Sequence, residues 1–95
     1  MIVGLLTAHL YFQGIGSLKE KRSIIKGLTG RLKSRFNISV AEVEHQDSKT
    51  TAVIAAAIVS SDSRFINQQL DSIINFMRND GRFYLGDVQR ETFSA

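Results

Sequence analysis

Apolar and polar residues repeat with two different periods along the chain, and this pattern predicts six secondary structure elements. Residues 1–12 form an apolar run typical of a strand, and residues 37–45 alternate between apolar and polar. Residues 50–59 are almost continuously apolar, which is typical of a strand at the centre of a sheet. The polar residues 46–49 predict a turn that joins these two segments into a hairpin. A last strand is expected over residues 82–93.

Two other segments repeat their apolar residues at the 3.6-residue period of an amphipathic helix. The first helix is expected over residues 18–36, where Ser17 can cap the N-terminus and Glu20 completes a capping box. The second is expected to be capped by Asp62 or the residue before it, and to end at the turn signal in residues 79–81. The expected buried stripes are Leu18, Ile24, Ile25, Leu28, Leu32 and Phe36 on the first helix, and Phe65, Ile66, Leu70, Ile73, Ile74 and Met77 on the second.

The order of elements is strand, helix, strand, strand, helix, strand, which amounts to two βαβ halves. Short connections and the right-handed crossover rule fold such halves into one antiparallel sheet with both helices on one face. We therefore predict an α+β fold of the ferredoxin-like βαββαβ type with a four-stranded sheet. The chain has 95 residues, of which 43% are hydrophobic, and this suits a single domain over residues 1–95.

The composition also bounds the compartment in which the protein is expected. There is no cysteine, hence no disulfide framework and no thiolate metal site. The apolar run at residues 1–6 is too short to span a membrane and lacks a basic leader followed by a cleavage site. We expect a cytoplasmic protein without a membrane partner.

Charge is strongly segregated along the chain. The first helix carries seven basic residues against the single acid Glu20, a net charge of +6, whereas the rest of the chain sums to −3. A positive field of this kind favours polyanionic partners. Placed at 100° per residue, the cations expected to contact such a partner are Lys19, Arg22, Lys26 and Lys33 on one flank of the helix and Arg31 and Arg35 on the other. Lys21 lies beside the apolar stripe and is expected to extend its amine to water.

A strip of small residues is expected between the two basic flanks, facing outward. It contains Gly27 and Gly30 together with Ser23 and Ser34. Glycine inside a helix costs about 0.8–1 kcal/mol relative to alanine, so two of them invite an explanation. One explanation is close approach of another backbone, either a nucleic-acid strand or a second helix. The other is an ordinary surface that tolerates glycine.

The open face of the predicted sheet is a second candidate surface. If Ile2 and every second residue after it face the helices, the opposite set of the first strand exposes Val3 and Leu5. Exposed apolar residues on an open sheet indicate a partner, and a homodimer is the simplest candidate. A few harmless apolar residues would give the same pattern.

The segment between the first strand and the first helix offers a weaker candidate for anion binding. Gly14, Gly16 and Ser17 precede a helix N-terminus, where free amides and the helix dipole favour a phosphate. Neither a dinucleotide fingerprint nor a Walker lysine pattern is present. Glycines required by a tight turn explain the segment equally well.

No catalytic, metal or cofactor site is expected. His9 and His45 are predicted to lie on different strands and towards opposite ends of the sheet. Glu42, Glu44 and Asp47 form the densest acidic cluster, but no partner for acid–base chemistry is evident, and a solvated strand end is the simpler interpretation. Residues 50–59 contain no aromatic ring, which argues against RNA bases stacking on the central strands.

Three segments resemble the small bacterial YlxP-like family of unknown function: Ser17-Leu18-Lys19-Glu20-Lys21-Arg22-Ser23, Phe36-Asn37-Ile38-Ser39-Val40-Ala41-Glu42-Val43, and Gln46-Asp47. The resemblance implies a ferredoxin-like fold and a cytoplasmic protein whose gene often neighbours those for translation initiation factor 2 and ribosome-binding factor A. Relatives often carry an aromatic residue and an arginine after the Gln-Asp pair, whereas this chain has Ser48-Lys49-Thr50-Thr51. This loop therefore lacks the side chains that would stack on a base.

Together these observations predict a non-enzymatic accessory factor that binds structured RNA or ribosomal particles through the basic first helix. The alternative is a homo-oligomeric regulatory module, or one that binds a small ligand or anion, using the open sheet face.

Overall fold

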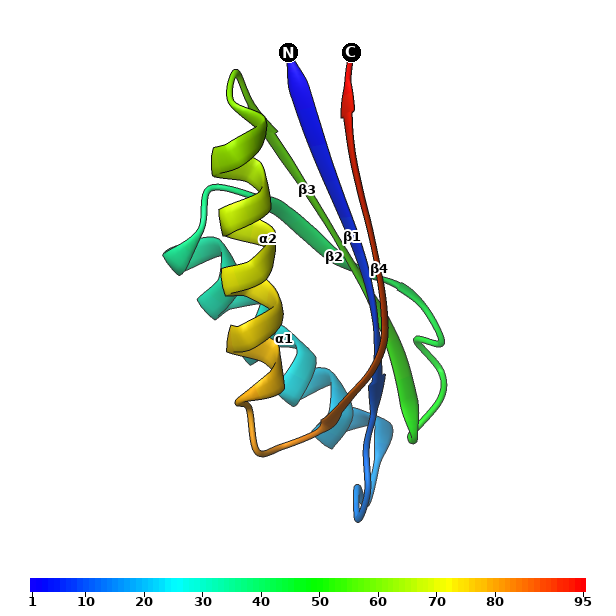
Figure 1. The fold of residues 1–95 in the computed structure, drawn as a ribbon. Helices are drawn as coiled ribbons and strands as arrows, with labels where there is room; N and C mark the ends of the chain where they lie inside the picture. The colour runs from blue at the N-terminus through cyan, green and yellow to red at the C-terminus, as the bar shows by residue number, and fades with distance from the viewer.

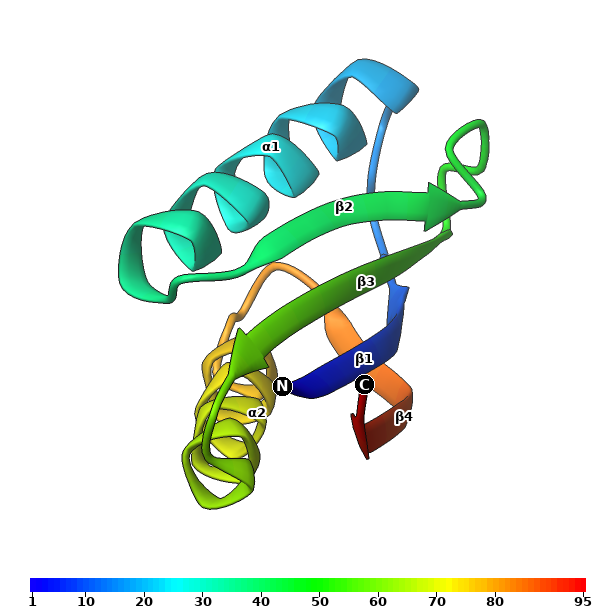
Figure 2. The same ribbon diagram turned by 90° about the horizontal axis from the view of Figure 1, so that it is seen from above.

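The computed structural model describes all residues 1–95 and contains the six predicted elements in the predicted order. Their bounds are β1 Ile2–Tyr11, α1 Leu18–Arg35, β2 Ser39–Glu44, β3 Thr51–Ser60, α2 Ser63–Arg78 and β4 Tyr84–Ser94. The strands form one antiparallel sheet in the order β2-β3-β1-β4. Both helices cover the same face of this sheet and leave the other face open (Figures 1 and 2). The prediction of a ferredoxin-like α+β fold is confirmed.

The core lies between the helices and the sheet, and it uses the predicted face of β1. Leu6, Ala8 and Leu10 are buried against the helices. Gly4 belongs to the same set, and a Cβ at this position would run into the side chain of Ile66 on α2. Glycine at position 4 therefore allows α2 to pack closely on β1.

The predicted buried stripe of α2 is wrong at one position. Phe65 is 45% exposed, whereas Phe76 is partly buried and packs edge to face on Phe36 of the segment after α1, with ring centroids 6.4 Å apart. At 100° per residue, Phe65 lies about 120° from the middle of the stripe formed by Ile66, Leu70, Ile73, Ile74 and Met77. Its hydrophobicity suggested burial, but the phase of the helix turns it towards water.

The predicted separation of the two histidines is wrong in part. His9 on β1 pairs with Val53 on β3, which in turn pairs with Glu44 at the end of β2. The two histidines therefore lie towards the same end of the sheet, with β3 between their strands. No group of three or more His, Asp or Glu side chains is arranged to hold a metal ion. No helix has the length and apolar character required to cross a membrane.

Candidate functional site

Helix α1 begins with the predicted cap, and the cap uses the groups of the candidate anion site. The Ser17 hydroxyl oxygen accepts a hydrogen bond from the Glu20 amide at 3.1 Å, and the Glu20 carboxylate accepts one from the Gly16 amide at 2.9 Å. Gly14 has a φ of 70°, as a tight turn requires. An external anion at Gly14, Gly16 and Ser17 would therefore have to compete with the carboxylate of Glu20.

Lys21 does not extend to water as predicted, because its side chain is completely buried. On the helical wheel it lies in the middle of the buried stripe, in line with Ile25, Leu28 and Leu32. Its Nζ donates hydrogen bonds to the backbone carbonyls of His45 at 2.7 Å and Ser48 at 2.6 Å. Lys21 therefore connects α1 to the loop between β2 and β3.

The carboxylate of Glu42 completes the surroundings of Lys21. Its Oε2 lies 3.2 Å from the Lys21 Nζ, is buried, and has no other polar partner. Sequence analysis placed Glu42 in a solvated acidic cluster, and this is wrong for Glu42, since its side chain is only 13% exposed. A register shift between Glu42 and Glu44 interrupts the regular alternation of β2. The acidic cluster is therefore divided, and its first member balances a buried lysine.

The outer flank of α1, formed by Lys19, Arg22, Lys26 and Lys33, remains cationic in the fold. All four residues are exposed. None of the three lysines forms an ion pair, and Arg22 approaches Asp47 only to 3.7 Å, with both side chains largely in water. Such an exposed pair is weak and easily exchanged. This flank therefore keeps the positive field that the sequence predicted.

The other flank of α1 does not face open solvent in the predicted way. Arg31 and Arg35 turn towards α2, and Gly27 lies beneath two guanidinium groups. A Cβ at Gly27 would be 3.5 Å from one terminal nitrogen of Arg31 and from one of Arg82. Gly30, in contrast, has open space above it. The predicted outward strip therefore includes Gly30 but not Gly27, because Arg82 reaches across from the segment after α2.

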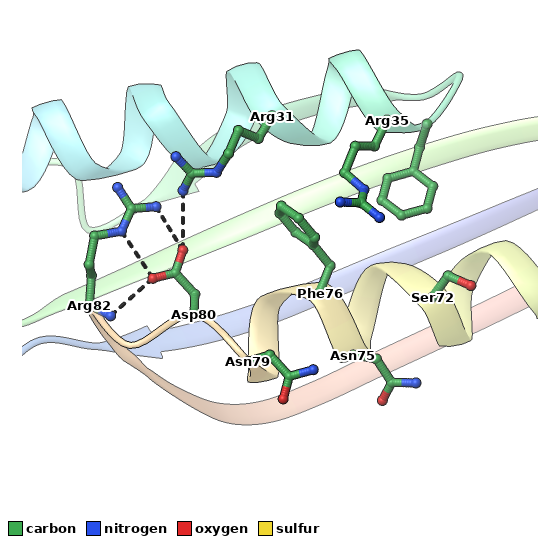
Figure 3. A pocket seen from close by; sticks show the side chains of 9 residues that line it. Arg31, Arg35, Ser72, Asn75, Phe76, Asn79, Asp80 and Arg82 are labelled. Carbon is green, nitrogen blue, oxygen red and sulfur yellow. Dashed lines mark hydrogen bonds and ion pairs between the residues drawn. The ribbon is translucent and has the colours of Figure 1, made fainter.

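Asp80 holds two of these guanidinium groups in place (Figure 3). Its Oδ2 accepts hydrogen bonds from Arg31 at 3.2 Å and Arg82 at 2.7 Å, and its Oδ1 accepts from the Nε of Arg82 at 3.0 Å. Burial raises the pKa of the Asp80 carboxyl above its ordinary value, and the guanidinium of Arg31 partly offsets this shift. Sequence analysis used residues 79–81 only as a helix end and missed this cluster. Arg82 is only two residues from Asp80, but Arg31 is 49 residues away, and no local pattern in the sequence links it to the other two.

Val3 and Leu5, the residues predicted to be exposed, both belong to the open-face set of β1, but only Leu5 is exposed. Leu5 is 37% exposed on the open face. Val3 is partly buried and is paired in register with Val59 of β3 on one side and Phe93 of β4 on the other. Val59 and Phe93 are themselves 62% and 38% exposed. An apolar row therefore crosses three strands on the uncovered side of the sheet.

Comparison with solved structures supports the fold. The de novo designed protein Foldit4 has a TM-score of 0.56 and 13% identity, and the match covers 100% of this chain and 99% of that chain. SnoaB, a cofactor-independent oxygenase from Streptomyces nogalater, has a TM-score of 0.50 and 13% identity, with coverage of 99% and 92%. At such low identity the similarity concerns the fold alone.

Comparison by sequence identifies relatives. The chain is 29% identical over 76 residues to the "Uncharacterized protein YlxP" of Bacillus subtilis (strain 168), a match that covers 80% of this chain and 83% of that protein. The predicted YlxP-like resemblance is thereby confirmed. The pattern of the family described as "Protein of unknown function (DUF503)" matches residues 3–90, and the chain belongs to this family.

Proposed function

We propose that this protein is a non-enzymatic accessory factor that binds structured RNA through the outer flank of α1. The observation that carries the proposal is that Lys19, Lys26 and Lys33 are exposed and lack carboxylate partners. They are spaced seven residues apart, so they form a row along one side of the helix with about 10.5 Å between successive positions. Such a row suits the regularly spaced phosphates of a nucleic acid.

Two further observations support RNA as the partner. Gly30 lies between the basic flanks with nothing within 4 Å of its missing side chain, so a sugar-phosphate backbone can approach the helix closely. The resemblance to YlxP-like proteins, whose genes often lie near those for translation factors, favours RNA over DNA. Binding through phosphates implies low sequence specificity and a steep dependence on salt.

RNA binding measured against salt concentration tests the proposal. Replacing Lys26 and Lys33 by Gln removes two phosphate contacts, so the slope of log affinity against log salt should become shallower by about 1.4–1.8. The matched control replaces Arg64 and Arg78 by Gln, since both are exposed on α2 and form no ion pair. This control removes the same charge from another surface and should retain most of the slope.

Two results would count against RNA binding by this flank. One is an unchanged slope and affinity in the Lys26→Gln, Lys33→Gln variant. The other is an equal loss in the Arg64→Gln, Arg78→Gln control, which would indicate an effect of net charge alone. Sedimentation of a cell lysate then shows whether the protein travels with ribosomal subunits, and whether the lysine variant loses that association.

The apolar row on the open sheet face favours a second candidate function, a homodimeric module. By strand alternation, the open-face positions of the two central strands contain no Asp, Glu, Lys or Arg. A second copy of the chain presents the same uncharged central strands and therefore complements them, whereas a polyanion would find no cation on these strands. Light scattering of the purified protein distinguishes a dimer from a monomer.

A further inference from the structure

A cleft of about 670 Å³ lies between the two helices near the C-terminal end of each, where α2 leads into β4. Helix α1 and the residue after it contribute two arginines and an aromatic ring, α2 contributes polar side chains and a second ring, and the following segment adds an acid and a third arginine (Figure 3). The lining residues are Arg31, Arg35, Phe36, Ser72, Asn75, Phe76, Asn79, Asp80 and Arg82. A volume of this size suits a small molecule.

The charge in this cleft is unbalanced. Three guanidinium groups face a single carboxylate, so the lining carries a net charge of +2. Asp80 is hydrogen-bonded to Arg31 and Arg82 and fixes their orientation before any ligand arrives. Arg35 forms no ion pair and no hydrogen bond, and its guanidinium lies over the Phe76 ring, 5.1 Å from the centroid. Two of the guanidinium groups are therefore held in place by Asp80, and the third, that of Arg35, is free to bind an anion.

The neutral polar groups of the cleft are also free. The hydroxyl of Ser72 and the side-chain amides of Asn75 and Asn79 make no hydrogen bond within the protein. All three residues border the cleft, but the two amides point away from the guanidinium groups (Figure 3). The guanidinium groups are therefore the donors that face a ligand, and they are strong donors to phosphate oxygens.

Gly27 does not line the cleft, but it lies beside two of its arginines. The two terminal nitrogens that approach it, one from Arg31 and one from Arg82, are each 3.5 Å from the place where a side chain would begin. The bare helix backbone thus lets both guanidinium groups rest against α1, and a large residue at position 27 would displace them.

We propose that this cleft is a binding site for a phosphate monoester, held by Arg31, Arg35 and Arg82. The dianionic charge of a phosphate monoester matches the net charge of the cleft, and the two phenylalanine rings provide an apolar border for the group that carries the phosphate. This inference goes beyond RNA binding, because it concerns another side of α1 and another set of cations.

Nuclear magnetic resonance titration tests this site with inorganic phosphate and with adenosine 5′-monophosphate, and adenosine serves as the uncharged control. Saturable shifts should appear in the residues that line the cleft. Arg35→Gln should weaken binding about tenfold or more, because it removes a charge-assisted donor. Arg64→Gln removes the same charge from the exposed surface of α2 and should leave the affinity within about twofold.

Gly27→Leu separates a defined site from general electrostatic attraction, because it changes no charge and displaces the guanidinium groups of Arg31 and Arg82, which lie against Gly27. It should weaken binding as strongly as Arg35→Gln, with unchanged circular dichroism confirming that α1 is intact. Equal weakening by Arg64→Gln, shifts that follow the outer flank lysines, or no saturation by either phosphate probe up to about 20 mM would overturn the site.

The source of the phosphate is distinguished by a second titration, with short RNA oligonucleotides that carry or lack a 5′-phosphate. If RNA with a 5′-phosphate binds more tightly than RNA without one, and Arg35→Gln removes this difference, the site binds the phosphorylated end of an RNA. If adenosine 5′-monophosphate binds the cleft but the 5′-phosphate of the RNA has no effect on RNA binding, the ligand of the site is a small phosphorylated molecule. The Lys26→Gln, Lys33→Gln variant should still bind phosphate in the cleft. A loss of RNA binding by the lysine row and a loss of phosphate binding by the cleft can therefore be told apart.

Discussion

Lys21 is the one charged side chain that the fold buries completely. Its aliphatic stem lies among Ile25, Leu28 and Leu32, while its ammonium group reaches two backbone carbonyls and the carboxylate of Glu42. An ammonium group has three N–H donors, and three acceptors surround this one. The basic motif at the start of α1 therefore contains one buried lysine that stabilises the fold, whereas its other basic residues are exposed.

Replacing Lys21 by Met should destabilise the protein by about 3–5 kcal/mol, because Glu42 would keep a buried charge without a partner. The matched control is Lys26→Met on the same helix, which removes an exposed amine and should change the free energy of unfolding by less than about 0.5 kcal/mol. Urea denaturation measures both. Adding Glu42→Gln to Lys21→Met should cost less than the sum of the single changes, and equal costs for the two methionine variants would contradict this role.

Helix α1 presents three sides with different surroundings. Its buried stripe packs on the sheet, its outer flank carries unpaired lysines, and its third side borders the cleft with Arg31 and Arg35. Gly30 lies between the last two sides in open space, whereas Gly4 on β1 lies directly beneath α2. The same residue type thus has different physical roles in the two elements.

The substitution of alanine should have opposite effects at these two glycines. Gly30→Ala should stabilise the protein by about 0.8–1 kcal/mol, because the methyl group meets no neighbour and alanine is the better helix former. Gly4→Ala should destabilise it by about 1–3 kcal/mol, since its methyl group would collide with the buried Ile66. Denaturant unfolding of both variants measures the difference, and two changes of the same sign would refute this account of the packing.

At the scale of the whole molecule, the proposed surfaces do not overlap. The lysine row and the cleft belong to the helical layer, and the apolar row of Val3, Val59 and Phe93 lies on the opposite side of the sheet (Figure 2). Dimerisation through the open face would therefore leave both cationic surfaces free.

Leu5→Lys tests the dimer, because burying an ammonium group in an apolar symmetric interface is unfavourable even with Glu91 as its cross-strand neighbour. If the parent protein is a dimer, this variant should scatter light as a monomer and remain folded, since Leu5 is 37% exposed within one chain. Gln68→Lys adds the same charge on the exposed side of α2 and should stay dimeric. A monomeric parent at all concentrations would exclude the apolar row as a self-association surface.

The order of elements, the cap of α1 and the helix-facing set of β1 could all be predicted from the sequence. Each depends on information that lies within a few residues. The alternation around Leu6 and Ala8 gives the buried face, and Ser17 with Glu20 gives the helix start. The exposure of Lys19, Lys26 and Lys33 follows equally from their phase on a helix that packs with one side only.

The tertiary structure alone decided which charges are free and where the cleft lies. Lys21 is buried because the loop after β2 covers it, and Gly27 is shielded because Arg82 arrives from the other end of the chain. Asp80 and Arg82 pair within one turn, but Arg31 joins them only once the two helices are placed side by side. Hydrophobic periodicity is a local property that the sequence by itself determines, whereas pairing between distant charges depends on the relative placement of whole elements, which no local pattern records.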